Sequence, residues 1–224
     1  MTTTPLTDLM TYGLDEQKRR IYFGDLLDSP AEDNDFTQRS VELAIRCLHR
    51  LVTLDAKKPI ELHMNSEGGD PYAMLRLYDE ILNCPCPIKF FGGGVVQSSA
   101  TWIMAICDER YLYPNTTVMV HDGHEAVDST HTDARIAMAE AKRLQDALYD
   151  IYADNSNMPR SFWEDVCQRD LYLSAEETVE LGLADSVLWP KNRKTLRGKT
   201  KKDVSSVLKK TIYARVNRIT STGD

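Results

Sequence analysis

Short strand-like segments alternate with amphipathic helical segments along most of this chain, and glycine or proline residues separate them. Helices are indicated by apolar residues at helical spacing, and strands by short apolar or alternating runs. The pattern predicts strands at 20–23, 59–64, 88–91, 111–113 and 117–120, and helices over about 41–51, 73–82 and 98–106. Gly92-Gly93-Gly94 is interpreted as the turn before the last of these helices. Repeated strand–turn–helix units favour an α/β fold with crossover connections.

The second half of the chain adds the longest predicted helix, over 130–153, in which charged residues flank an apolar face. A short helix is expected at 160–167 and a strand at 171–173. Ser174 and Glu177 have the spacing of a capping box, so another helix is predicted to begin there. Gly182 is suited to the left-handed residue that ends it.

The length of 224 residues and the 42% hydrophobic content allow the chain to bury the core of one domain. We expect an N-terminal arm at 1–12, a folded domain at 13–190 and a basic extension at 191–224. The extension carries 11 Lys and Arg against 2 Asp and Glu, whereas the rest of the chain carries 16 against 32. Two interpretations of the extension stay open. In the first, it contacts nucleic-acid phosphates. In the second, it is a solvated segment or a helix that docks on another subunit.

The sequence also indicates the cellular compartment of the protein and the state of its cysteines. No apolar run approaches the roughly 20 residues that span a bilayer, and the first residues lack the features of a secretory signal. We therefore expect a cytoplasmic protein without membrane contact. The five cysteines are irregularly spaced, and Cys84-Pro85-Cys86 is one residue short of a CxxC motif. They are interpreted as reduced thiols, and neither a metal site nor a cofactor is expected.

The segment Asn65-Ser66-Glu67-Gly68-Gly69-Asp70 lies between a predicted strand and a predicted helix. Paired glycines allow the backbone to turn sharply and to bring amide groups close to a ligand. Such amides can stabilise a carbonyl oxygen that becomes negative in a transition state. A plain structural turn is the alternative interpretation.

Ser98 and Ser99 compete for the role of a nucleophile, and a helix-capping role for both is the alternative. A serine nucleophile needs a base and a carboxylate that orients the base. His121, at the end of a predicted strand, is the leading base, and Asp170 is the candidate carboxylate. The other histidines are rivals for the role of base: His49, His63, His124 and His131.

Five motifs follow one another along the chain. They are Asn65-Ser66-Glu67-Gly68-Gly69, then Gly94 with Ser98 after three residues, then Pro114-Asn115 with Val118-Met119-Val120-His121, then Arg169-Asp170 with Leu173-Ser174-Ala175-Glu176-Glu177, and then Gly182-Leu183-Ala184-Asp185. Together they resemble the Clp protease proteolytic subunit, over about Arg20 to Leu188. Each motif is modest alone, but the ordered set is specific.

The resemblance implies a spiral of ββα units, an architecture shared with crotonase-like enzymes, with the helix at 130–153 as a protruding handle. It also implies that Ser98 is the nucleophile, His121 the general base and Asp170 its orienting carboxylate. The amides of Gly69 and Ser99 would form the oxyanion hole. Substrate binding is expected at Gly68, Asp70, Asp122 and Gly123, with the peptide added as a strand along 69–70 and 122–127.

The resemblance further implies a homo-oligomeric ring, with two rings stacked through the handles, and polypeptide substrates fed into an enclosed chamber by a Clp-type ATPase unfoldase. The chain departs from the family pattern at Glu67, Ser99-Ala100 and Asp122-Gly123, and in its basic extension. Two other functions stay open. One is an inactive ring-forming or scaffold subunit, and the other is a crotonase-like enzyme that binds acyl-CoA.

Overall fold

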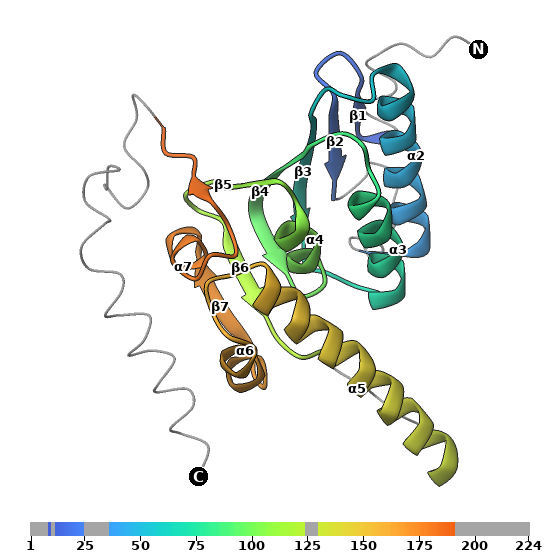
Figure 1. The fold of residues 1–224 in the computed structure, drawn as a ribbon, viewed down its shortest axis with the longest axis vertical. Coiled ribbons are helices and arrows are strands. Elements are labelled where there is room, and N and C mark those ends of the chain that lie inside the picture. Colours follow the sequence, from blue (N-terminus) through green and yellow to red (C-terminus); the bar gives the residue numbers. More distant parts are fainter. Residues whose placement is uncertain (1–8, 10–11, 25–35, 124–129, 191–224) are drawn as a thin grey trace.

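A curved, eight-stranded β-sheet forms the centre of the described part of the chain (Figure 1). The structure, a computed structural model, describes residues 9, 12–24, 36–123 and 130–190. The strands are β1 (Leu14–Asp15), β2 (Arg20–Phe23), β3 (Ile60–Ser66), β4 (Ile88–Gln97), β5 (Glu109–Leu112), β6 (Thr117–Val120), β7 (Leu171–Ser174) and β8 (Ser186–Val187). The helices are α2 (Gln38–Leu54), α3 (Pro71–Leu82), α4 (Ala100–Ile106), α5 (His131–Asp154), α6 (Arg160–Val166) and α7 (Ala175–Glu180). The extension at 191–224, the segment 124–127 and most of the N-terminal arm lie outside the described residues.

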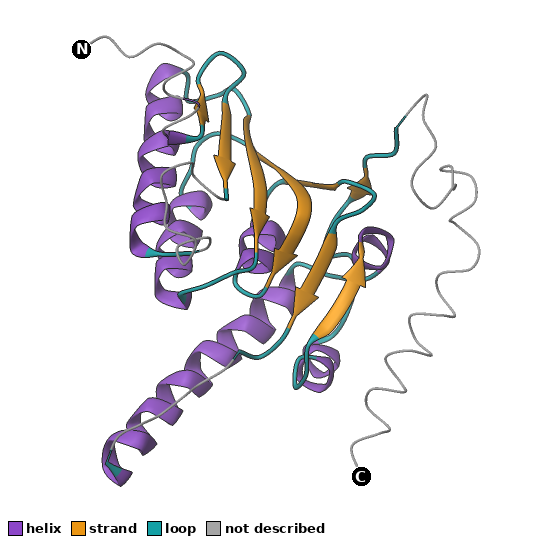
Figure 2. Ribbon diagram, turned by 180° about the vertical axis from the view of Figure 1, so that it is seen from behind, coloured by secondary structure: helices purple, strands orange, loops and turns teal. Residues whose placement is uncertain are grey.

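The sheet is mostly parallel, which confirms the predicted α/β class. Strands β2, β3, β4, β5 and β8 lie side by side in parallel, and β1 pairs antiparallel with β2. Helices α2 and α3 connect the parallel strands and cover one face of this part of the sheet (Figures 1 and 2). Strand β6 pairs with the far half of β4, and β7 pairs antiparallel with β6. The short strands β1 and β8 are elements that the sequence pattern did not predict.

The glycine-rich segment Gly92–Gly94 is part of a strand, so the predicted turn at this position is wrong. Strand β4 continues through it for ten residues and changes its partner on the way. Its first half pairs with β5 as far as Gly92, and its last residues pair with β6 from Val95 onward. A side chain on Gly92 would collide with Leu112, and Gly94 has a φ of 70°. Glycine is needed here because the strand bends between two partners. Local sequence does not distinguish such a bend from a turn.

Helices α2, α3 and α7 begin at residues whose side chains accept hydrogen bonds from amides of the first turn. Thr37 and Ser40 form a reciprocal capping box at the start of α2, and the Asp70 carboxylate accepts from the Tyr72 amide at the start of α3. The capping box predicted for Ser174 and Glu177 is confirmed at α7, and Gly182 has the expected left-handed φ of 80°.

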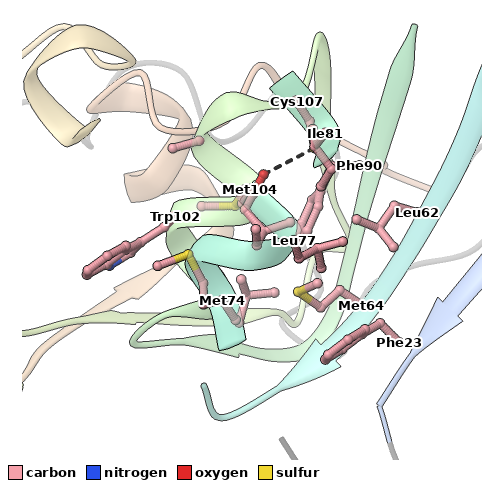
Figure 3. Close-up of a cluster of buried hydrophobic side chains, with 14 of the residues drawn as sticks. Phe23, Leu62, Met64, Met74, Leu77, Ile81, Phe90, Trp102, Met104 and Cys107 are labelled. Carbon is pink, nitrogen blue, oxygen red and sulfur yellow. Dashed lines mark hydrogen bonds between the residues drawn. The ribbon is translucent and has the colours of Figure 1, made fainter. Parts of the chain in front are cut away.

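Part of the hydrophobic core lies between the sheet and the helices α3 and α4 (Figure 3). Leu62 and Phe90 project from neighbouring strands toward Met74 and Leu77 of α3, and all four are buried. Val96 of β4 and Ala100 of α4 belong to the same buried cluster, and the candidate site lies at the junction of these two elements.

Helix α5 confirms the predicted long helix and projects from the body of the subunit (Figures 1 and 2). Its buried residues are confined to its last two turns, at Leu148, Tyr149, Ile151 and Tyr152. Within the described ranges, no helix is both long and apolar enough to cross a membrane.

Candidate active site

Ser98 lies on a sharp turn between β4 and α4. Its φ of 50° is in the left-handed region, which is strained for a serine. Its amide donates to the Met119 carbonyl of β6 at 2.8 Å, which anchors the turn to the sheet. A side chain on Gly68 would place its Cβ 2.7 Å from the Ser98 Cβ, so only glycine allows this approach. The turn presents the Ser98 hydroxyl outside the end of the sheet.

Strand register brings His121 and Asp170 to the same place. Gln97 of β4 pairs with Met119 of β6, so Ser98 and His121 both follow the ends of adjacent parallel strands. Val120 pairs with Leu171 of β7 in antiparallel register. The next residue after Val120 is therefore opposite the residue before Leu171, and these residues are His121 and Asp170.

The three side chains lie within contact distance. His121 Nε2 lies 2.8 Å from Ser98 Oγ, a hydrogen-bond distance. His121 Nδ1 lies 3.2 Å from Asp170 Oδ1, which is an ion-pair distance, although the pair does not have the geometry of a regular hydrogen bond. Catalytic hydrogen bonds are often long or poorly aligned in enzymes without substrate and tighten when substrate binds. The imidazole is 12% exposed and the Asp170 side chain 42% exposed, so the base is shielded while its carboxylate faces solvent.

The rival histidines have other surroundings. His49 contacts Glu80 at 2.7 Å on the helical side of the sheet, and His63 contacts Glu61 at 3.0 Å on the open face. His131 is exposed at the start of α5. His124 lies outside the described residues. Among the histidines that the structure describes, His121 is the one beside Ser98.

Ser99 differs from Ser98 in its burial and its hydrogen-bond partner. Its side chain is buried, and its hydroxyl donates to the Gly69 carbonyl at 3.2 Å. Phe36 pairs with Gly69 as an isolated β-bridge. The Phe36 amide donates to the Gly68 carbonyl, and the Phe36 carbonyl accepts from the Asp70 amide, both at 2.8 Å. The amides of Gly69 and Ser99 have no acceptor among the described residues. Gly69, Ser98 and Ser99 all line the same cavity, so both of these unused amide donors belong to residues beside Ser98.

A cavity of about 300 Å³ adjoins Ser98 and His121. The residues that line it are Gly69, Pro71, Ser98, Ser99, Trp102, His121, Asp122, Gly123, Ala141, Leu144, Gln145 and Leu148. Of the residues expected to bind substrate, Asp122 and Gly123 are in this lining. Gly68 and Asp70 are not. Gly68 packs under Ser98, and Asp70 caps α3 and uses its own amide and carbonyl in bonds to Phe36 and Met74.

Sequence reasoning missed a buried link between the nucleophile turn and α5. The Thr101 hydroxyl donates to the Ser98 carbonyl and also bonds to the Tyr152 hydroxyl. Both side chains are fully buried, and burial raises the pKa of Tyr152 well above its usual range. Phe36 and Met119, which position Gly69 and Ser98, were also missed. No local pattern marks these residues, because each acts through a partner distant in sequence.

No group of three or more His, Cys, Asp and Glu side chains in the described ranges is arranged to hold a metal ion. The arrangement at Ser98 instead has the parts needed for acyl transfer: a hydroxyl, an adjacent imidazole, a carboxylate and two unused amides.

Comparison with known proteins agrees with the motif-based resemblance. The family model described as Clp protease matches residues 33–191. The chain is similar to the ATP-dependent Clp protease proteolytic subunit of Deinococcus radiodurans, with 28% identity over 66% of this chain and 74% of that protein. It is also 28% identical to the Porphyromonas gingivalis protein of the same name, over 79% of this chain and 76% of that protein. Subunit 1 from Chlamydia pneumoniae is 26% identical over 79% of this chain and 90% of that protein.

The mixed α/β fold and the family match together define a protease, one of the hydrolases. The chain belongs to the Clp protease family. At 26–28% identity to these relatives it is a divergent member.

Proposed function

We propose that this protein is a serine endopeptidase that cleaves unfolded proteins or peptides through Ser98, His121 and Asp170. The observation that carries the proposal is the contact of His121 with both partners, at 2.8 Å to Ser98 Oγ and 3.2 Å to Asp170 Oδ1. A largely shielded imidazole between a hydroxyl and a carboxylate is the arrangement that activates a serine.

In this mechanism, His121 Nε2 accepts the Ser98 proton while Ser98 Oγ attacks the peptide carbonyl. Asp170 holds the imidazole with its proton on Nδ1 and stabilises the imidazolium that forms. The carbonyl oxygen becomes negative and accepts hydrogen bonds from the Gly69 and Ser99 amides. The imidazolium then gives its proton to the leaving amine, and water releases the acyl group from Ser98 by the same steps in reverse.

Substrate would lie extended between the backbone near Gly69 and the segment that begins at Asp122 and Gly123. The carbonyl to be attacked would then face the two unused amides. The open carbonyl and amide groups of an unfolded segment suit this binding, because a folded substrate has already paired its own backbone groups.

We further propose that the protein works as a homo-oligomeric ring, with two rings stacked, whose active sites face an enclosed chamber. The curated relatives are named proteolytic subunits of an ATP-dependent protease, so an ATPase that unfolds and feeds substrates is the proposed partner. Helix α5 supports this assembly because it projects from the subunit and exposes Ile136 and Met138, which are 64% and 56% exposed.

Covalent labelling tests the catalytic proposal. Wild-type protein should react with a fluorophosphonate probe and hydrolyse fluorogenic peptides, and Ser98→Ala should lose both activities. Ser161→Ala, an exposed serine on α6, is the matched control and should behave as wild type. Undiminished labelling of Ser98→Ala would move the nucleophile elsewhere. Absence of labelling in wild-type protein would instead favour an inactive scaffold.

A further inference from the structure

The cavity beside Ser98 is lined by apolar and polar side chains. The apolar ones include Trp102 of α4 and Leu144 and Leu148 of α5. The polar ones include Asp122 and Gln145, which are hydrogen-bonded to each other. A volume of about 300 Å³ is sufficient for one long side chain, and the position beside Ser98 is where the residue that supplies the attacked carbonyl must lie.

The position of Asp122 is fixed from two sides. Its amide donates to the Cys167 carbonyl at 2.8 Å, just beyond the end of α6. Its Oδ2 accepts from the Gln145 Nε2 at 2.9 Å. Its Oδ1 accepts no hydrogen bond from any described residue, and the side chain is half-buried. One carboxylate oxygen is thus held by the protein, and Asp122 itself lines the cavity.

The negative charge of Asp122 has no cationic partner in the described lining of the cavity, since His121 is the only other titratable group there. Tyr149 and Cys167 lie close to Asp122, and burial first, then the charge of Asp122, raises the pKa of Tyr149 to about 12. Arg160 lies over the Tyr149 ring but forms ion pairs with Asp146, Asp150 and Glu164. A basic side chain of a ligand would supply the cation that Asp122 lacks within this lining, and such charge complementarity gives specificity.

From this geometry we propose that the cavity selects substrates with lysine or arginine at the residue whose carbonyl Ser98 attacks, and that Asp122 is the specificity-determining residue. The inference rests on the proposed peptidase function. The aliphatic part of a basic side chain would pack on Trp102 and the leucines, and its charged end would reach the Asp122 carboxylate. A carboxylate in the corresponding pocket of trypsin selects basic residues in the same way.

The test compares peptides that differ only in one charge. Lysine and its uncharged analogue norleucine have similar chains, so the ratio of kcat/KM for the two peptides isolates the contribution of the charge. We expect wild-type protein to prefer lysine by about tenfold or more, as for sites built around a polar group. Asp122→Asn should bring the ratio close to one or below it. Asp165→Asn, an exposed carboxylate on α6, is the matched control and should keep the wild-type ratio.

A ratio near one in wild-type protein, or an unchanged ratio in Asp122→Asn, would overturn the inference and leave the proposed peptidase function intact. If wild-type protein turns over neither peptide, that result would instead challenge the proposed function.

A binding experiment tests the inference in that case. Binding of the same two peptides to full-length Ser98→Ala protein is measured by calorimetry, with and without the additional substitution Asp122→Asn. Tighter binding of the lysine peptide that depends on Asp122 supports the inference, and equal binding of the two peptides rejects it.

Discussion

Two adjacent serines at the end of β4 have different contacts. Ser98 is held in a strained left-handed conformation and contacts His121, whereas Ser99 points away and bonds to the Gly69 carbonyl. The single bond from Ser99 joins two segments, each of which supplies one of the unused amides. We therefore propose that Ser99 is a positioning residue, whose side chain sets the spacing between those amides without itself reacting.

Replacing this hydroxyl should loosen the oxyanion hole without unfolding the protein. We expect Ser99→Ala to lower kcat/KM about threefold to tenfold, the effect of one hydrogen bond of about 1 kcal/mol. The loss should fall mainly on kcat, because the amides act in the transition state. The affinity of a peptide aldehyde, which forms a tetrahedral adduct, should fall in parallel.

Kinetics of Ser99→Ala and Ser161→Ala over a range of substrate concentrations would check this prediction. An increase in KM at constant kcat would contradict it, because that result would show a role in ground-state binding alone.

The roles of these residues could be predicted only in part from sequence. Physical reasoning on the residues left open which of Ser98 and Ser99 is the nucleophile, and the resemblance to a family favoured Ser98. The decisive quantity is the φ of Ser98, which depends on how β4 meets β6 and on the missing Cβ of Gly68. His121 and Asp170 meet through the pairing of Val120 with Leu171, and register between distant strands is not encoded locally.

At the scale of elements, the open face of the parallel sheet carries two rows of side chains across β2, β3, β4 and β5. One row is aromatic. The His63 ring lies between Tyr22, with ring centres 4.9 Å apart, and Phe91, at 4.7 Å, and Phe91 contacts Tyr111 at 5.2 Å. The other row alternates in charge, from Arg20 through Glu61 and Lys89 to Glu109. Since successive strands are in register, these rows tie four strands together.

Truncating the centre of the aromatic row should weaken the sheet. Phe91→Ala removes the ring contacts with His63 and Tyr111, and we expect a decrease of about 1–3 kcal/mol in the free energy of unfolding, since the side chain is only half-buried. Urea denaturation measures the change. Leu82→Ala, at an apolar side chain that is 57% exposed, is the control and should change stability by less than about 0.5 kcal/mol. Equal effects of the two substitutions would show that the aromatic row contributes no more than an exposed residue.

Element types were predictable where the hydrophobic period was clear, as in α2, α3 and α5. The exception at Gly92–Gly94 arises because β4 pairs with β5 first and with β6 afterwards. A strand that changes partner needs flexible residues at the change, and those residues are the ones that also form turns. Strands β1 and β8 have only two residues each, so they exist through their pairing and not through their own sequence.

At the scale of the whole molecule, Arg110 joins parts of the chain that are far apart in sequence. Its guanidinium donates to the Asn155 carbonyl after α5 and forms an ion pair with Asp185 before β8, at 2.8 and 2.7 Å. Burial alone would raise the pKa of Asp185. The hydrogen bonds and charge of Arg110 outweigh this effect, so the pKa lies below its usual range.

This pair makes stability depend on pH. Because the pKa of Asp185 is lower in the folded than in the unfolded state, its contribution is complete above about pH 5 and is lost as pH falls below its usual pKa of about 4. Asp185→Asn should be less stable than wild type at neutral pH by no more than about 1 kcal/mol, because solvent screens the partly exposed carboxylate. The difference should shrink in acid. Urea denaturation from about pH 7 to about pH 3 measures it, and a difference that grows in acid would reverse the assigned sign.

The projecting half of α5 carries the last prediction, which rests on the proposed assembly. Ile136 and Met138 make little contact with their own subunit, so replacing them should change the stability of an isolated subunit by no more than about 0.5 kcal/mol. If this surface is buried between subunits, a charge placed there must be desolvated on assembly, which is unfavourable. The double variant Ile136→Glu, Met138→Glu should therefore have a lower native mass, while its far-ultraviolet circular dichroism stays unchanged.

Thr132→Glu, on the same exposed half of the helix, is the control. It adds a charge without removing an apolar side chain, so its native mass should be closer to that of wild type. A double variant with the full wild-type mass would show that the exposed apolar residues of α5 do not hold the assembly together.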